Sequence, residues 1–493
     1  MELELKFALI PQELKHLSRQ LARIPLTGKR KPKRQTLHNT YYDTPEHSLQ
    51  NQRIALRVRQ LGTAAHPQWV QTLKTGGAAN SALSQRGEWE AALQTAQLSH
   101  ALLAQTPWAE LDPKGTLFHS LAPVFTTTFE RMSWEITLED AAVELALDVG
   151  SVYMDGHSTP LCELEIELLH GEPDTLFEVA ALISQHISLL PLHMSKAERA
   201  YRLAQGTLHA PMRARPPELH AGLPFAALAQ TVLRECFLQF TANLYTVRSS
   251  EAPEVLHQAR VGWRRFKSAL KLFKQHGADS GLGTLAALQP LLLHMNALRD
   301  LDVVTNEVLP LYASAYHAGV AQRLAHWQEL DGALAQERQT QRAALLQCLA
   351  EPVVGQALVH ITAWLETGTI TLAQTLGKQG TRTPAKWVRR RMEKLAMELA
   401  SGQLQAREMQ DLHRLRILAK RLRYGVENMR PLLPKKRAAR WLRSATQLQT
   451  HVGWERDQQQ AIALAQRLNG PAEIIAFLRG AAFATAQAGA APA

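Results

Sequence analysis

The sequence predicts a multidomain protein of the α+β class, in which an antiparallel β domain precedes an all-α domain. The first part contains short runs that alternate apolar and charged residues, such as MELELKF, IALRVRQL and LCELEIELL, and this pattern indicates half-buried strands. The second part has long helical periodicity with few interior prolines. Between them, QGTLHAPMRARPPELHAGLP is rich in proline and glycine, which is typical of a linker.

The domain boundaries follow from these changes of pattern. We expect a first domain at residues 1–205, a linker at 206–217 and a helical domain at 218–485 with repeats at 218–370 and 371–485. The formal net charge of +11 divides unevenly, into −4 for residues 1–205 and +15 for the remainder. The helical half is therefore expected to attract an anion, either nucleic acid or polyphosphate.

Other features of the composition exclude several classes of protein. Cys162, Cys236 and Cys348 lie far apart without metal-binding spacing, which favours a reducing compartment over a disulfide framework. The charged first turn does not resemble a signal peptide, and no apolar run approaches the roughly 20 residues of a membrane span. The sequence thus predicts a cytoplasmic protein with no membrane partner.

The opening strand has one charged face, formed by Glu2, Glu4 and Lys6, because alternate residues of a strand point the same way. Other predicted strands repeat this pattern with Arg57, Arg59, Lys74, Arg86, Glu88, Glu90, Glu144, Asp148, Glu163, Glu165 and Glu167. For any single strand, the ordinary interpretation is a polar face turned to solvent. The faces are sorted by sign, however, and a closed barrel with these faces inward would offer both signs to one ligand.

Sorted acidic and basic faces suit phosphoryl transfer. Carboxylates bind hard divalent cations such as Mg²⁺ or Mn²⁺, and arginine and lysine neutralise phosphate oxygens. A metal-activated water then needs mainly positioning and charge stabilisation. No P-loop and no Ser/His/Asp arrangement is recognisable in the sequence.

The residues that carry these charges resemble the CYTH superfamily of triphosphate tunnel metalloenzymes, and within it the bacterial inorganic triphosphatases. Glu2, Glu4 and Lys6 match the ExExK signature, and seven further blocks from NTYYDTPEHSLQNQRIALRVR to SKAERAYRL follow in the family's order. The resemblance covers about residues 1–205. It implies an eight-stranded antiparallel β tunnel barrel that binds a linear triphosphate.

The resemblance also implies roles for single residues. The metal ligands, for Mg²⁺ or Mn²⁺, would be Glu2, Glu4, Glu163 and Glu165. The phosphate clamp would be Lys6, Arg57, Arg59, Lys74, Arg131 and Lys196. Arg86 and Glu88 would pair across the lining, and Asp148 is a further acidic candidate. Whether Glu167 lies in the tunnel or beyond it stays open, and Glu90 and Glu144 are expected at the rim or in a structural role.

The helical half contains an internal repeat, because VLHQARVGWRRFKSALKLF aligns with DLHRLRILAKRLRYGVENM at an offset of 156 residues. At about 100° per residue, the basic residues of each copy form one stripe along a helix. We expect the stripes to bind an anion through His257, Arg260, Arg264, Arg265, Lys267, Lys271, His413, Arg416, Lys420, Arg421 and Arg423. The alternatives are a solvated helix face and metal binding by the two histidines.

This repeat resembles the CHAD domain, the conserved-histidine α-helical domain that often accompanies a CYTH domain. The resemblance covers about residues 218–485 and implies duplicated four-helix bundles with a basic groove for inorganic polyphosphate. Nucleic acid is disfavoured as the partner, because no aromatic residues alternate with the basic ones along the stripes.

The leading hypothesis is a metal-dependent inorganic triphosphatase that cleaves tripolyphosphate to pyrophosphate and phosphate. Its helical module would recruit polyphosphate or direct the enzyme to polyphosphate granules. The alternatives are thiamine triphosphatase or adenylate cyclase activity on the same tunnel, or a scaffold that binds polyphosphate without catalysis.

Overall fold

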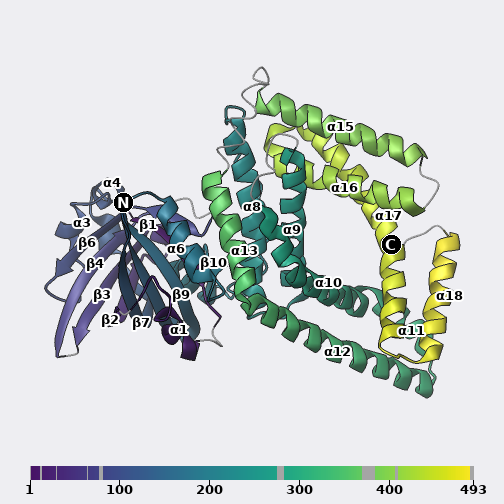
Figure 1. The fold of residues 1–493 in the computed structure, drawn as a ribbon, viewed down its shortest axis with the longest axis horizontal. Coiled ribbons are helices and arrows are strands. Elements are labelled where there is room, and N and C mark those ends of the chain that lie inside the picture. The colour runs from purple at the N-terminus through teal and green to yellow at the C-terminus, as the bar shows by residue number, and fades with distance from the viewer. Residues whose placement is uncertain are drawn as a thin grey trace. The chain divides into compact units, whose positions relative to one another are not determined.

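The computed structural model describes residues 2–10, 14–28, 30–63, 65–76, 81–274, 282–368, 383–405 and 409–488 (Figure 1). The chain forms two compact units. The first, which we call the tunnel unit, comprises Met1–Met212, Thr241–Ser250 and Ala350–Thr367. The second, the helical unit, comprises Arg213–Phe240, Glu251–Leu349 and Gly368–Ala493. The predicted fold class, an antiparallel β part followed by a helical part, is confirmed.

The tunnel unit is built on one antiparallel sheet. Its strands are β1 (Glu2–Ala8), β2 (Lys33–Asp43), β3 (Ala55–Thr63), β4 (His66–Lys74), β5 (Leu83–Arg86), β6 (Glu88–Leu93), β7 (Ala122–Thr137), β8 (Ala142–Met154), β9 (His157–His170) and β10 (Leu190–Pro191). They pair in the order β10-β1-β9-β8-β7-β2-β3-β4-β6, and β5 pairs with β1. The β8–β9 hairpin turns through Asp155 and Gly156, both at positive φ, as a two-residue turn between twisted strands requires.

The pairing closes into a ring because β5 and β6 form one bent strand. β5 pairs with β1, and after Gly87 the chain continues as β6, which pairs with β4. A Cβ atom at Gly87 would lie 2.2 Å from the ring of Trp89, so a larger residue at this bend would have to displace that side chain. With β5 and β6 taken as one strand and the two-residue β10 left aside, the ring has the eight strands that the family resemblance implies.

The apolar faces of the strands point outward and the charged faces inward. Around β1 and β9, the outer face packs under α1 (Leu14–Leu21) and α6 (Asp174–Ser184), with Phe7, Leu164 and Leu176 fully or almost fully buried. Elsewhere the outer face is covered by α2 (Ser48–Asn51), α3 (His100–Leu103), α4 (Trp108–Leu111) and α5 (Thr116–His119). Helix α7 (Lys196–Ala204) packs instead on inward-facing residues of the strands, among them Tyr41 and Phe125. Helix α13 (Pro352–Ala363) packs on α6. Most of the hydrophobic core therefore lies outside the barrel, and the cavity within it is lined mainly by charged side chains.

The helices of the second half are long, as predicted. They are α8 (Phe225–Val247), α9 (Pro253–Lys274), η2 (Leu282–Leu288), α10 (Gln289–Val303), η3 (Val304–Val308), α11 (Pro310–His317), α12 (Ala321–Ala350), η4 (Trp364–Gly368), α15 (Pro384–Gln405), α16 (Met409–Met429), η6 (Arg430–Leu432), α17 (Lys435–Arg467) and α18 (Ala472–Ala488). The two halves of the sequence repeat, α9 and α16, pack against each other. The apolar positions opposite the first stripe are buried, among them Ala259, Phe266 and Phe273.

Among the described helices, none is by itself long and apolar enough to cross a bilayer. One bent pair, Ala321–Ala350 with Pro352–Thr367, satisfies the criteria of length and composition when its two helices are taken together.

Candidate functional site

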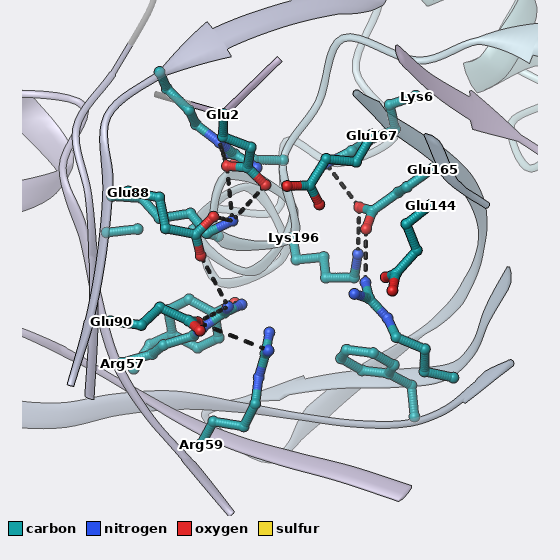
Figure 2. A pocket seen from close by; sticks show the side chains of 18 residues that line it. Glu2, Lys6, Arg57, Arg59, Glu88, Glu90, Glu144, Glu165, Glu167 and Lys196 are labelled. Atoms are coloured by element: carbon teal, nitrogen blue, oxygen red, sulfur yellow. Dashed lines mark hydrogen bonds and ion pairs between the residues drawn. The ribbon is translucent and has the colours of Figure 1, made fainter. Parts of the chain in front are cut away.

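The interior of the ring is a cavity of about 520 Å³ (Figure 2). It is lined by Glu2, Lys6, Tyr41, Ala55, Arg57, Arg59, Lys74, Arg86, Glu88, Glu90, Phe129, Arg131, Glu144, Glu165, Glu167, Ser195, Lys196 and Ala197. Most of these side chains are charged and few are apolar, so the cavity suits a small, highly charged ligand.

Strand register explains why acids and bases meet in the cavity. Residues directly opposite on antiparallel strands have neighbouring side chains. Lys6 lies opposite Glu165, with its Nζ atom 3.0 Å from the carboxylate. Lys74 lies opposite Glu88, with 2.9 Å between the charged atoms. Because the side-chain period of a strand is two, the alternation seen in the sequence is enough to place all these charges on the inner face.

Carboxylates crowd one side of the cavity. Glu2 accepts hydrogen bonds from Lys74 at 3.0 Å and from Arg86 at 2.9 Å, and Arg86 also donates to Glu4 at 2.5 Å. Glu167 lies directly opposite Glu4 on the neighbouring strand. Burial, followed by the charge of Glu2 and smaller contributions from Glu88 and Glu4, raises the pKa of Glu167 to about 7. This side therefore carries more negative charge than its cations neutralise.

Guanidinium groups crowd another part of the cavity. Arg59 donates to Asn39 at 2.9 Å, and its nearest carboxylate, Glu90, is 4.0 Å away. Burial, followed by the charges of Arg57 and Arg131, lowers the pKa of Arg59 to about 10. Glu90 is shared with Arg57 at 3.7 Å and is itself 45% exposed. This part of the cavity has unneutralised positive charge and suits an anion.

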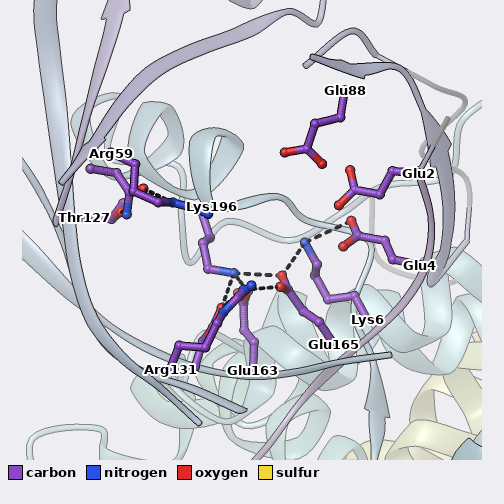
Figure 3. A network of polar contacts seen from close by, with 12 residues as sticks. Glu2, Glu4, Lys6, Arg59, Glu88, Thr127, Arg131, Glu163, Glu165 and Lys196 are labelled. Atoms are coloured by element: carbon purple, nitrogen blue, oxygen red, sulfur yellow. Dashed lines mark hydrogen bonds and ion pairs between the residues drawn. The ribbon is translucent and has the colours of Figure 1, made fainter. Parts of the chain in front are cut away.

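A buried ion network lies beside these two regions (Figure 3). Lys196 begins helix α7, which Ser195 caps by accepting a hydrogen bond from the backbone of Glu198. Its Nζ atom lies 2.7 Å from Glu165 and 2.8 Å from Asp148. Although burial opposes it, the positive charges of Lys196, Lys6 and Arg131 hold the pKa of Glu165 well below its usual range. The network keeps Glu165 ionised and fixed.

The predicted cations all line the cavity, but the predicted acids are divided. Glu2, Glu88 and Glu165 line it. Glu4, Asp148 and Glu163 are almost fully buried, and each pairs with a cation that lines the cavity. Glu163 is fully buried and pairs with Arg199 at 2.6 Å and with Lys196 at 3.2 Å. The three acids whose position was open or placed at the rim, Glu90, Glu144 and Glu167, are cavity-lining residues.

The donor chemistry of the acidic side fits a divalent cation. Carboxylate oxygens are the ligands that Mg²⁺ and Mn²⁺ prefer, and a cation between Glu2, Glu4 and Glu167 would relieve the crowding that raises the pKa of Glu167. In this conformation no three acidic, histidine or cysteine side chains in the described part of the chain are grouped as ligands. Instead, the carboxylate of Glu2 pairs with Lys74 and that of Glu4 pairs with Arg86.

Sequence reasoning missed several residues that shape the site. Tyr41 and Phe129 line the cavity, and Tyr41 accepts a hydrogen bond from Arg57 at 3.5 Å. Tyr41 belongs to the block NTYYDTPEHSLQNQRIALRVR that carries the family resemblance. Its place in that block, close to Arg57 and Arg59, could have indicated a position in the site. Arg199 belongs to SKAERAYRL but follows Lys196 on a helix, so strand alternation could not identify it.

A second charged site lies in the helical unit, where the two predicted stripes meet. The charges of Arg264, Arg416, Arg456 and Arg260, after burial, lower the pKa of Lys420 to about 7. Arg456 also lies 3.7 Å from Asp300, which joins the equivalent Arg-Asp pairs of the two repeats. We call Arg260, Arg264, Arg416, Lys420 and Arg456 the basic cluster. It combines residues from both repeats.

The other predicted stripe residues are not equivalent to these five. Arg265 is 2% exposed and donates to Gln239 and Asn428, both at 2.6 Å, so it lies in the helical core. Arg423 pairs with Glu427 at 3.1 Å. Lys267 and Lys271 are exposed on α9, whereas His257 and Arg421 are half-buried. The side chain of His413 lies outside the described residues.

Family models match both halves of the chain. The model for the CYTH domain matches residues 1–201, and the model for the CHAD domain matches residues 231–466. An inorganic triphosphatase of Haemophilus influenzae is 31% identical over 204 residues, which cover 41% of this chain and 54% of that protein. The match thus spans about half the length of this curated relative.

Two solved structures are similar in parts. The CHAD domain of the plant Ricinus communis aligns at 27% identity with a TM-score of 0.48, covering 56% of this chain and 91% of that one. A Hippeastrum protein, described as an adenylyl cyclase with a dominant triphosphatase activity, aligns at 22% identity with a TM-score of 0.31. That alignment covers 42% of this chain and 97% of the Hippeastrum chain.

Proposed function

Because this chain joins a CYTH domain to a CHAD domain, we propose that it is a metal-dependent inorganic triphosphatase with a polyphosphate-binding helical module. The tunnel unit would hydrolyse tripolyphosphate to pyrophosphate and phosphate. The observation that carries this proposal is the opposite charge imbalance within one closed cavity. The nearest carboxylate to Arg59, that of Glu90, is 4.0 Å away, whereas Glu167 lies directly opposite another carboxylate, Glu4, on the neighbouring strand.

A metal-bound triphosphate matches both imbalances at once. Its phosphate oxygens would take the guanidinium groups of Arg57, Arg59 and Arg131, which are suited to bidentate binding of phosphate. Glu2, Glu4, Glu165 and Glu167 would hold the Mg²⁺ or Mn²⁺ ion, which supplies Lewis-acid stabilisation and lowers the pKa of a bound water. Glu163 was predicted as a ligand as well, and its pairing with Arg199 makes it a support for Lys196 in this proposal.

The residues of the chain have mainly positioning and electrostatic roles. The Nζ atoms of Lys6 and Lys196 lie 3.0 and 2.7 Å from the Glu165 carboxylate. They can therefore stabilise negative charge that develops on a phosphate bound next to Glu165. Their charges are already oriented by buried partners before substrate binds, which reduces the reorganisation that the reaction requires. Lys74 and Arg86 can exchange carboxylate partners for phosphate oxygens when a cation takes over Glu2 and Glu4.

The helical unit supports the second part of the proposal. The basic cluster gathers five cations from two repeats and contains no carboxylate, with Asp300 at 3.7 Å from Arg456 as a close acidic neighbour. A linear polyphosphate has repeated negative charges that such a cluster can neutralise together. We infer that the cluster recruits long polyphosphate chains, and association with polyphosphate granules in the cytoplasm would follow from that binding.

The test is phosphate release from tripolyphosphate, ATP and thiamine triphosphate in Mg²⁺ or Mn²⁺, with Glu4→Gln as the inactive control. We expect strong preference for tripolyphosphate, lost in the variant and on chelation. Preference for an organic triphosphate would mean that the tunnel acts as a thiamine triphosphatase or an adenylate cyclase instead. No release from any substrate, with polyphosphate still bound, would support the non-catalytic scaffold.

A further inference from the structure

A second cavity, of about 340 Å³, lies in the tunnel unit outside the charged tunnel. It is lined by Ser158, Thr159, Pro160, Cys162, Arg199, Leu203, Leu208, His209, Tyr245, Arg248 and Ser249. Its volume falls in the range of roughly 300–1,000 Å³ that small-molecule sites occupy. None of the lining residues is acidic, although two of them are arginines.

Arg248 is the residue that requires an explanation. Its Nη2 atom donates to the backbone oxygen of Leu9 at 2.5 Å, and the guanidinium lies over the ring of Tyr245 at 5.5 Å. Its Nε and Nη1 atoms are buried without a hydrogen-bond partner. No carboxylate in the described part of the chain pairs with it. Buried polar groups are normally hydrogen-bonded, and an unpaired buried charge costs several kcal/mol.

Arg199 brings a second guanidinium to the same cavity. Its guanidinium group also lies over the Tyr245 ring, 5.5 Å from the ring centroid. Its Nη1 atom donates a hydrogen bond to the Tyr245 hydroxyl at 2.5 Å. Its Nη2 atom pairs with Glu163 at 2.6 Å, but its Nε atom is buried without a partner. Burial and, as a smaller contribution, the charge of Arg199 lower the pKa of Arg248, although Tyr245 and Cys162 act in the opposite direction.

The cavity lacks an internal counterion for these groups. Burial raises the pKa of the Cys162 thiol to about 12, so this side chain stays neutral. At the rim, the exposed Ser249 contacts the His209 ring at 2.9 Å, which adds a further group able to donate a hydrogen bond. Ser158 and Thr159 supply hydroxyl groups to the lining. Two guanidinium groups and several hydroxyls around a cavity of this size are the chemistry of an anion site.

We propose that this cavity binds a small oxyanion of the phosphate class beside the guanidinium groups of Arg248 and Arg199, which line it. The anion would neutralise the unpaired charge of Arg248. The site is separate from the tunnel, yet it is connected to it, because Arg199 pairs with Glu163 and Glu163 pairs with Lys196 at 3.2 Å. An oxyanion that binds Arg199 would weaken the ion pair between Arg199 and Glu163 and so alter the position of Lys196.

The test is equilibrium dialysis of radiolabelled inorganic phosphate against the full chain in a chelating buffer. The variants are Arg248→Gln, which removes the charge, and Ser249→Glu, which places a carboxylate at the exposed rim. The matched control is Arg23→Gln, an exposed arginine of the same unit. We expect both pocket variants to bind one phosphate fewer per chain than wild type, and the control to bind as wild type does.

Unchanged phosphate stoichiometry in both pocket variants would overturn the proposal. If Arg248→Gln does not fold, as judged by its thermal unfolding, Ser249→Glu decides, since Ser249 is exposed and its replacement removes no buried group. The measurement needs no catalytic turnover, so its result is independent of whether the tunnel hydrolyses triphosphates. Binding at the basic cluster contributes equally to every variant and cancels in the comparison, and Arg199, through which the cavity reaches the tunnel, is unchanged in all of them.

Discussion

The tunnel and the basic cluster both present cations to an anion, but they hold these cations in different ways. In the tunnel, each cation except Arg59 has a carboxylate within 3.7 Å, as Lys196 has in Asp148, Glu163 and Glu165. In the basic cluster, cations mainly face other cations, and burial together with these charges lowers the pKa of Lys420 to about 7.

This difference has a physical consequence for binding. Mixed charges fix side chains in place and leave oxygens that can hold a metal, so the tunnel is suited to chemistry on a small ligand. Like charges gathered on helices repel one another until an anion neutralises them, so the basic cluster is suited to binding a long polyanion. The predictions below separate the two sites, from the largest expected effect to the smallest.

Replacing Lys196 by methionine should have the largest effect. Loss of one oriented charge-stabilising group typically lowers kcat about 100- to 1,000-fold, and removal of one partner from a buried ion network destabilises a fold by about 3–5 kcal/mol. We expect loss of tripolyphosphate hydrolysis, a lower Tm and unchanged polyphosphate binding. Arg202→Met is the matched control on the same helix, because Arg202 pairs with the neighbouring Glu198. Near-normal hydrolysis by folded Lys196→Met would contradict this role.

Replacing Arg264 and Arg416 together by glutamine should produce the opposite pattern. Each charge-assisted contact contributes about 1.5–3 kcal/mol, so polyphosphate binding should weaken roughly 100-fold or more. Hydrolysis of tripolyphosphate should stay at the wild-type level. Lys394→Gln, an exposed lysine on α15, serves as the control in a titration with polyphosphate. Equal affinities for the double variant and the control would refute the basic cluster as the binding site.

Polyphosphate binding should also depend on pH through Lys420. A lysine is charged below its pKa, so with a pKa of about 7 the amine gains a proton as pH falls from 8 to 6. The groups facing it are Arg260 and Arg264 on α9, Arg416 on α16 and Arg456 on α17. Affinity should therefore rise several-fold as pH falls through this window. Lys420→Arg, which stays charged, should flatten the profile, and a profile unchanged by this replacement would exclude Lys420 as the cause.

The smallest effect is expected for Glu90→Gln at the tunnel. The Glu90 side chain is 45% exposed and lies 3.7 and 4.0 Å from Arg57 and Arg59, and exposed ion pairs of this kind contribute about 0–1 kcal/mol. Removing the charge frees both arginines for substrate, so KM for tripolyphosphate should fall about twofold with kcat unchanged. A large fall in kcat would mean instead that Glu90 takes part in the reaction.

Much of the fold could be predicted because it depends on periodic patterns. Strand alternation placed Glu2, Lys6, Arg57 and Glu165 on one inner face, and helical periodicity together with the repeat identified α9 and α16. The same alternation could not tell which inward residues reach the cavity, because depth depends on packing across the ring. Glu163 shares a face with Glu165, yet Arg199 from a distant helix holds it within the wall.

Contacts between elements distant in sequence explain the remaining differences. Helical spacing puts Arg265 next to Arg264, and only the packing of α9 on its neighbours shows that Arg265 points to Asn428 in the core. The oxyanion cavity was not predicted for a similar reason. Arg248 follows α8 and Arg199 lies on α7, and no local pattern signals that they meet at Tyr245.

The most direct test of the central claim measures whether the tunnel needs metal and triphosphate together. Calorimetric titration would use a triphosphate analogue with methylene bridges, which cannot be hydrolysed, in Mg²⁺ and in chelator, with the basic cluster removed by the Arg264 and Arg416 replacements. The account predicts tight one-to-one binding in Mg²⁺, at least tenfold weaker binding in chelator, and loss of the Mg²⁺ effect in Glu4→Gln. Equal affinity with and without metal would contradict the assignment of the acidic side to a cation.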